Sequence, residues 1–287
     1  MNLDYSFTRY LAAKKTIDDR ALNQHVWQRM VQTLPATSRQ KPLRILEVGA
    51  GIGTMVERLV ERGVLTHAVY TAIDAQASNI EQARRRLHAI PATIRLELEA
   101  IDFFDFVARE QNVRHWDLII AHAFLDLLDL PTALPLLFSL LPAGGFFYFT
   151  INFDGATILQ PTIDATFDAQ VEALYHRTMD ERMTAGKPSG DSQSGRHLFQ
   201  LLRGVGGEIL AAGSSDWVVF AAQDGYPADE AYFLHFIINT MDGALNEHPE
   251  LDQTRFKAWI AQRHAQIEAG TLVYIAHQLD FFGVSAQ

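Results

Sequence analysis

Short apolar runs alternate with amphipathic stretches along the first half of the chain. Residues 54–63 and 77–90 carry apolar side chains at helical spacing, and residues 93–100 alternate strictly, as a half-exposed strand does. Four continuous apolar runs are typical of strands buried on both faces of a sheet, namely residues 43–48, 68–74, 116–124 and 145–151. Strands and helices that alternate in this way predict an α/β fold with a mainly parallel sheet and helices on both faces.

The remaining segments interrupt this rhythm. The first is amphipathic and ends at Pro35 and Pro42, which predicts helices packed against the core. We predict a helical N-terminal cap at residues 1–42 and an α/β core at residues 43–153. A lid-type insertion is expected at residues 154–195. The rest of the core follows at residues 196–287 and contains a helical insertion at about residues 224–270. Two late extended segments, residues 207–222 and 271–282, predict a closing pair of strands.

Composition narrows the classes of protein and ligand. The chain has 287 residues, with 24 Lys and Arg against 34 Asp and Glu, so its formal net charge is −10. This acidic balance disfavours nucleic-acid binding, which needs a basic face. The absence of cysteine excludes disulfides and thiolate chemistry and fits a reducing compartment. We expect a soluble cytoplasmic protein, because the uncharged stretch 130–153 is broken by prolines and glycines.

A glycine-rich turn follows the first predicted strand. Residues 47–53 read Glu-Val-Gly-Ala-Gly-Ile-Gly and stand between a strand and a helix. Glycines there permit a tight turn and a close approach of a ligand to the backbone at a helix N-terminus. The G-x-G-x-G spacing, with Thr54 and Val56 after it, does not match the dinucleotide fingerprint G-x-G-x-x-G.

Acidic residues follow three successive strands: Glu47, Asp74 and Asp102. Because ligands of open α/β sheets bind beyond the carboxyl ends of the strands, these acids are expected at one edge. Three acids at that edge suit a ligand that carries an amine, a ribose diol and an adenine amine. Each acid taken alone could instead be a helix N-cap or a loop carboxylate.

These motifs resemble those of the class I, Rossmann-like methyltransferases that use S-adenosylmethionine. The resemblance rests on ILEVGAGIGT, AIDA, IDFFD and WDLIIAHAFLDLL, and it covers residues 43–153. It implies a seven-stranded sheet with one antiparallel closing strand, and S-adenosylhomocysteine as a product. It further implies cofactor contacts from the glycine turn, the three acids and their neighbours, namely Glu47, Gly49, Ala50, Gly51, Gly53, Asp74, Ala75, Asp102 and Phe103.

His122 follows the fourth strand and is the candidate catalytic base, since its ordinary pKa suits proton removal near neutrality. The alternative is a histidine that only lines the cofactor pocket. The spacing of His122, Asn152 and Asp154 does not match a metal-dependent methyltransferase, so no metal is expected. The Asn-Pro-Pro-Tyr pattern used on nucleic-acid base amines is also absent.

The added segments are the expected source of the lid and the substrate pocket. Tyr10 and Arg20 are candidates to reach the methionine carboxylate, Arg20 as a cofactor residue. The substrate-binding candidates are Tyr10, Asn152, Tyr175 and His176. An apolar stripe at residues 231–241 is read as core or as the seam of a homodimer.

The resulting hypothesis is a methyltransferase that acts on an oxygen or nitrogen atom of a small, uncharged-to-anionic metabolite. One alternative is a non-catalytic S-adenosylmethionine-binding partner or sensor. A nicotinamide-dependent oxidoreductase is a second alternative, disfavoured by the glycine spacing.

Overall fold

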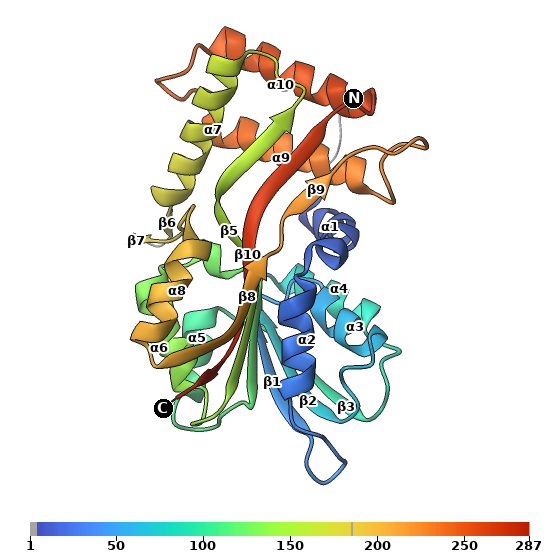
Figure 1. Cartoon of the computed structure of the whole chain (residues 1–287), viewed down its shortest axis with the longest axis vertical. Coiled ribbons are helices and arrows are strands. Elements are labelled where there is room, and N and C mark those ends of the chain that lie inside the picture. The colour runs from blue at the N-terminus through green and yellow to red at the C-terminus, as the bar shows by residue number, and fades with distance from the viewer. Residues whose placement is uncertain (1–4, 185, 287) are drawn as a thin grey trace.

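The computed structural model describes residues 5–184 and 186–286 (Figure 1). The strands are β1 (Leu43–Val48), β2 (Ala68–Asp74), β3 (Ile94–Ala100), β4 (Leu118–His122), β5 (Phe146–Gln160), β6 (Met183–Thr184), β7 (Lys187–Pro188), β8 (Gly207–Ser214), β9 (Trp217–Val219) and β10 (Val273–Ser285). The helices are α1 (Phe7–Ala21), α2 (Gln24–Thr33), α3 (Thr54–Glu61), α4 (Ala77–Arg86), α5 (Phe103–Glu110), the 3₁₀ turn η1 (Leu125–Leu127), α6 (Leu130–Ser139), α7 (Ala165–Asp180), α8 (Ser194–Gly204), α9 (Glu230–Leu245) and α10 (Gln253–Glu268).

The central sheet has the order β3-β2-β1-β4-β5-β10-β8, and β10 runs in the direction opposite to the other strands on this path. The predicted α/β fold with a mainly parallel sheet is therefore confirmed. Seven strands lie on this path, but β9 adds an eighth beside β10. The count of seven was too low because residues 207–222 are not one strand: the chain breaks at Ser215 and Asp216 between β8 and β9.

Helices cover both faces of the sheet, as the apolar runs predicted. Along β1, Ile45 packs into a cluster with α1, α2, α3 and α4. Leu46 and Val48 point to the opposite face and pack with α5, α6 and α8. Alternate residues of one strand thus serve two cores, since successive side chains leave a strand on opposite faces.

Strand β5 departs most from the prediction. Its apolar run covers residues 145–151, but the strand continues to Gln160, through the start of the expected lid insertion. Ile151 and Gly155 have positive φ angles of 58° and 73°, and the pairing of β5 with β10 shifts register nearby. The strand is bent by these irregularities, which also interrupt the alternation that would have marked it in the sequence.

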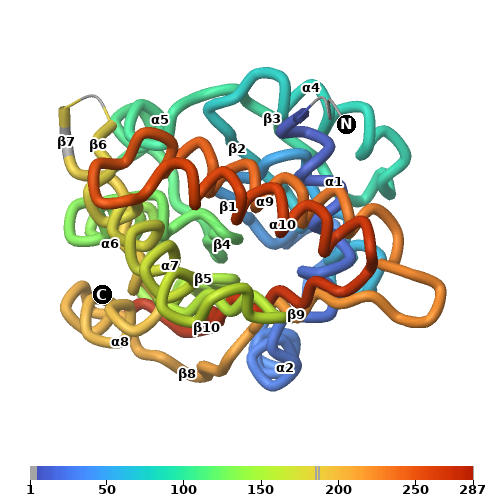
Figure 2. The backbone as a smooth tube through the Cα atoms, turned by 90° about the horizontal axis from the view of Figure 1, so that it is seen from above, coloured from blue at the N-terminus to red at the C-terminus, as the bar shows by residue number. Residues whose placement is uncertain are grey.

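The far halves of β5 and β10 rise above the rest of the sheet and carry α7, α9 and α10 as an upper lobe (Figure 1). In the view from above, α9 and α10 run side by side across the top of the molecule (Figure 2). The lobe therefore stands over the edge to which the carboxyl ends of β1 and β4 point.

Helix α1 is joined to this lobe through a buried carboxylate. Glu230 at the start of α9 is completely buried. It accepts hydrogen bonds from the Arg20 guanidinium at 2.5 and 2.9 Å and from the Thr16 hydroxyl at 2.7 Å. No helix among the described residues is long and apolar enough to cross a membrane.

Arg20→Ala should lower the free energy of unfolding by about 1–3 kcal/mol, because Glu230 would keep a buried charge with only Thr16 as a partner. Chemical denaturation followed by circular dichroism would measure the loss. Arg29→Ala, at an exposed position of α2, is the matched control and should change stability little. Equal stability of the two variants would show that the ion pair does not hold α1 to α9.

Candidate functional site

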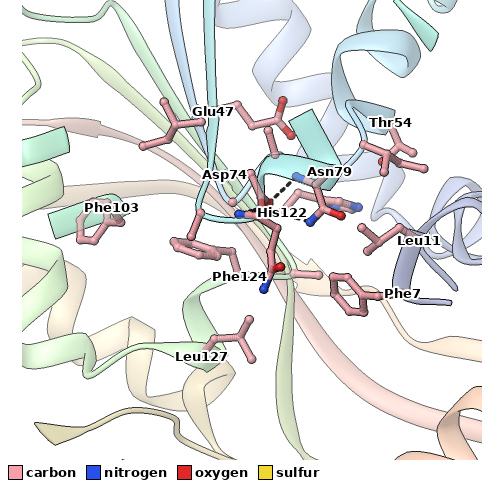
Figure 3. A pocket seen from close by; sticks show the side chains of 18 of the residues that line it. Phe7, Leu11, Glu47, Thr54, Asp74, Asn79, Phe103, His122, Phe124 and Leu127 are labelled. Atoms are coloured by element: carbon pink, nitrogen blue, oxygen red, sulfur yellow. Dashed lines mark hydrogen bonds between the residues drawn. The ribbon is translucent and has the colours of Figure 1, made fainter. Parts of the chain in front are cut away.

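A cavity of about 290 Å³ opens at the carboxyl edge of β1, β2 and β4 (Figure 3). Its walls come from the glycine turn after β1, the ends of β2 and β4, the start of α5 and the inner face of α1. Many of the predicted site residues line it, namely Glu47, Gly49, Ala50, Gly51, Asp74, Ala75, Asp102, Phe103 and His122. Residues from three separate strand ends thus meet in one place, as the strand-end rule predicted.

The backbone conformation of this turn and the side chains that pack against it both require glycine. Gly49 and Gly51 have φ angles of 65° and 54°, in the left-handed region that favours glycine. A Cβ atom at Gly49 would lie 2.2 Å from the ring of Phe124. Gly53 has a φ angle of 81° and is the N-cap of α3, but it does not line the cavity. A Cβ there would lie 2.6 Å from Leu87, so Gly53 serves packing.

The Asp74 carboxylate is fixed by donors from the turn and from α4. It accepts hydrogen bonds from the backbone N–H of Gly51 at 2.8 Å, from the backbone N–H of Gln76 at 2.8 Å, and from the Asn79 amide at 3.0 Å. Asn79 is buried and lines the cavity, and its Oδ1 atom has no partner among the described residues. A ligand with hydrogen-bond donors fits this edge of the cavity, because a buried acceptor without a partner is costly.

Glu47 is buried on the face of β1 that packs toward α3. The Tyr70 hydroxyl donates a hydrogen bond to it at 2.8 Å. Burial raises the pKa of Glu47 to about 8, although this hydrogen bond and the positive charge of Arg58 act in the opposite direction. Glu47 therefore carries a proton at neutral pH.

Asp102 and Phe103 begin α5. The Asp102 carboxylate caps this helix by accepting the backbone N–H of Phe104 at 2.7 Å, and it is exposed at the mouth of the cavity. The sequence left open whether Asp102 is a helix N-cap or a cofactor residue. In the structure it caps α5 and also lines the cavity. Phe103 is 4% exposed, so its ring forms a fixed wall.

His122 ends β4 and has hydrogen bonds at both ring nitrogens. Nε2 lies 3.0 Å from the Asp18 carboxylate and Nδ1 lies 2.8 Å from the Thr150 hydroxyl. Burial lowers the pKa of His122 to about 4, even though Asp18 acts to raise it. The ring is therefore neutral, with Nε2–H donating to Asp18 and Nδ1 accepting from Thr150. This arrangement favours the pocket-lining alternative over a free catalytic base.

Comparison with known proteins bears on this cavity directly. The chain matches the family described as methyltransferase domain over residues 46–147. The resemblance to class I methyltransferases that the motifs predicted is thereby confirmed for this part of the chain. The turn, Glu47, Asp74, Asp102 and His122 all belong to it.

One curated relative and two solved structures extend the comparison. A malonyl-[acyl-carrier protein] O-methyltransferase of Bacillus cytotoxicus is 35% identical over 115 residues, which cover 39% of this chain and 36% of the relative. The match thus spans about a third of that protein's length. A proposed methyltransferase of Bacillus halodurans has a TM-score of 0.53 at 10% identity, covering 92% of this chain and 100% of that one. YjhP of E. coli has a TM-score of 0.50 at 15% identity, covering 97% and 99%. At these identities the two structures show a shared fold.

Helix α1 completes the cavity with side chains that the sequence analysis did not select. Phe7, Leu11 and Lys14 line the cavity from this helix. The side chain of Lys14 is buried, and its ammonium lies 3.6 Å from Asp18. Lys14 is thus the cation of α1 that faces the cavity. No group of three or more His, Asp or Glu side chains within residues 5–184 and 186–286 is arranged to hold a metal ion.

Arg20 and Tyr10 were expected at the cofactor and do not line the cavity. Arg20 binds Glu230 at the opposite side of α1, so its placement at the cofactor was wrong. The ring of Tyr10 stacks on Phe236 at 4.2 Å and on Phe233 at 5.6 Å, between α1 and α9.

Asn152, Tyr175 and His176 also lie outside the lining. Asn152 is inside β5 rather than after it, and its amide donates to the backbone oxygen of Leu279 at 2.8 Å. His176 lies 2.9 Å from the hydroxyl of Thr157, and its pKa is lowered by burial. Asn152 and His176 are therefore structural in this arrangement, and the ring of Tyr175 lies 6.3 Å from that of His176.

The neutral state of His122 can be tested by nitrogen NMR of the ring. We expect a neutral imidazole with the proton on Nε2 at pH 8 and still at pH 5, because the pKa lies near 4. The unfolded chain takes up this proton below about pH 6.5, so His122 reduces stability as the pH falls from 6.5 toward 4. Protonation of the folded-state ring near pH 6.5 would contradict this assignment.

Proposed function

We propose that the protein transfers a methyl group from S-adenosylmethionine to an oxygen or nitrogen atom of a small metabolite and releases S-adenosylhomocysteine. The observation that carries this proposal is the cavity, which gathers the glycine turn, Asp74 and Glu47 of a methyltransferase domain. The similarity of one region to an enzyme that methylates oxygen supports the same class of reaction.

Among the described residues, no helix spans a membrane and the sequence lacks cysteine, so we also propose a cytoplasmic location. The homodimer stays a prediction for light scattering to test.

The residues present fit such a cofactor. We assign the ribose hydroxyls to Asp74, whose two oxygens are held in place by backbone N–H groups. Asn79 Oδ1 supplies a further buried acceptor beside it. Phe103 is assigned to the adenine face and Asp102 to the adenine amine.

The methionine end of the cofactor carries an ammonium and a carboxylate. We assign the ammonium to Glu47, which can ionise when a cation arrives, and the carboxylate to Lys14 in place of Arg20. Lys14 fits because it is buried in the lining, whereas Arg20 is occupied by Glu230. Opposite charges would then meet at both groups with little exposure to water.

The bound sulfonium supplies an activated methyl group, so the protein must mainly orient the acceptor and exclude water. His122, Phe124 and α1 enclose that part of the cavity. Because His122 is fixed by Asp18 and Thr150, it acts as a rigid wall that positions the reacting groups. A proton moving to His122 would have to displace the hydrogen bond at Nδ1.

A non-catalytic sensor of S-adenosylmethionine is the second candidate, since His122 has no free ring nitrogen. Incubation of the purified protein with methyl-labelled S-adenosylmethionine and a metabolite extract separates the two. Label in a small molecule supports the methyltransferase. Tight binding of S-adenosylhomocysteine without any transfer supports the sensor.

Asp74→Ala should weaken S-adenosylhomocysteine binding about 10-fold to 100-fold, equivalent to about 1–3 kcal/mol, through the loss of the paired acceptor. Calorimetry on the full chain measures this change. Asp105→Ala, at an exposed position of α5 outside the cavity, is the control and should bind normally. Unchanged affinity in Asp74→Ala would refute the ribose assignment.

Cofactor binding should release a proton at pH 7. The free protein holds a proton on Glu47, because its pKa is about 8, and an incoming ammonium lowers that pKa. Affinity should therefore rise with pH from 6 to 8. Calorimetry of S-adenosylhomocysteine binding in two buffers of different ionisation enthalpy counts the protons. Glu47→Gln should abolish the release, and equal proton release by both proteins would exclude Glu47 as its source.

A further inference from the structure

The cavity that contains the glycine turn has an apolar end, which is formed by two elements that lie far apart in the sequence. Phe7 and Leu11 line this end from α1 (Figure 3). Phe124, Leu127 and Leu128 line it from the turn after β4. These five side chains are called the apolar end below. A ligand held there would contact both α1 and the turn.

Two side chains of the apolar end are unusually open to water. Phe7 is 49% exposed and Leu127 is 43% exposed, whereas large apolar side chains are mostly buried in folded proteins. The ring of Phe7 is held from one side by Tyr10 and Phe236, with ring centroids 5.7 and 6.3 Å away. Its place is therefore set before a ligand binds. An apolar ligand that covered these side chains would be stabilised, because it would remove their surface from water.

Phe124 connects the apolar end with the proposed cofactor region. Its ring packs directly on the glycine turn, since a Cβ atom at Gly49 would lie 2.2 Å from it. The same ring meets Phe103 edge to face, with centroids 6.3 Å apart. The turn then continues to Leu127, at the end of η1. A molecule bound on this turn therefore lies beside the cofactor and not at a distant surface.

The charged side chains that line the cavity are already assigned to the cofactor. Among the described residues these side chains are Lys14, Glu47, Asp74 and Asp102. His122 also lines the cavity, but its ring is neutral. Asp126 lies in the turn after β4 and does not line the cavity. A charged acceptor would thus lose its hydration without gaining an opposite charge, which is costly.

We propose that the methyl acceptor is an uncharged molecule whose apolar body binds at the apolar end, between Phe7 and Leu127. This inference rests on the proposed methyltransferase function and specifies the class of its substrate. Phe7 and Leu127 select the acceptor by the apolar surface that it offers to them. Acceptors with a carboxylate or an ammonium group are rejected, because that charge would face apolar side chains and a neutral imidazole.

The test measures the binding of linear primary alcohols, from ethanol to octanol, to the full chain saturated with S-adenosylhomocysteine. Titrations followed by NMR suit such weak ligands. We expect each added methylene group to tighten binding about 3-fold to 4-fold until the apolar end is filled. The carboxylate and the ammonium compound of the same chain length should bind at least about 10-fold more weakly than the alcohol.

Phe7→Ala and Leu127→Ala should each weaken hexanol about 5-fold or more and ethanol much less, because the lost contacts are with the far part of the longer chain. Both side chains are partly exposed, so these variants should fold. Phe220→Ala is the matched control, since Phe220 is 55% exposed and lies outside the cavity lining. It should bind both alcohols as the unmodified protein does.

The substrate assignment is overturned if affinity does not rise with chain length or if the charged compounds bind as tightly as the alcohols. It is also overturned if neither Phe7→Ala nor Leu127→Ala weakens hexanol. Normal S-adenosylhomocysteine binding in those cases leaves the proposed function standing. Failure of the unmodified protein to bind S-adenosylhomocysteine overturns both.

Discussion

The packing of the N-terminal helix on the rest of the protein depends on the carboxylate of Asp18. It is completely buried on α1, and its two oxygens accept hydrogen bonds from the indole of Trp217 at 2.9 Å and from His122 at 3.0 Å. Burial acts to raise the pKa of Asp18, but Lys14 and the hydrogen bond from His122 outweigh it and hold the pKa well below its ordinary value. One permanent negative charge thereby joins the N-terminal helix to β4 and β9. Such a buried charge is stable only while its partners stay in place, so these three elements must assemble together.

The upper lobe is built on the same sheet as the region that matches the methyltransferase family, residues 46–147. Because β5 and β10 extend past the parallel strands, α7, α9 and α10 sit on a continuation of the core rather than on a separate hinged unit. The bends at Ile151 and Gly155 turn this continuation. Tyr274, near the start of β10, lies against Phe233 of α9 with ring centroids 6.1 Å apart, so the extended strand supplies part of the surface on which α9 packs.

The sequence predicted the half of the site that follows strict local rules. Acids directly after β1, β2 and β3 reach one edge because parallel strands end together, so Glu47, Asp74 and Asp102 could be found. The residues of α1 could not be assigned, although Phe7, Leu11, Lys14 and Asp18 have the spacing of one helical face. Helical periodicity identifies such a face but not the surface that it meets. Arg20 lies six residues after Lys14, which turns it to another side of the helix.

The properties of the site that the sequence could not predict depend on how the surroundings of each carboxyl group shift its pKa. Asp18 is held ionised by Lys14 and His122, whereas Glu47 is held protonated by burial. Asp74 is directed by backbone N–H groups toward one geometry. Because these side chains carry the same chemical group, the neighbours that the fold places around each one decide whether it is charged.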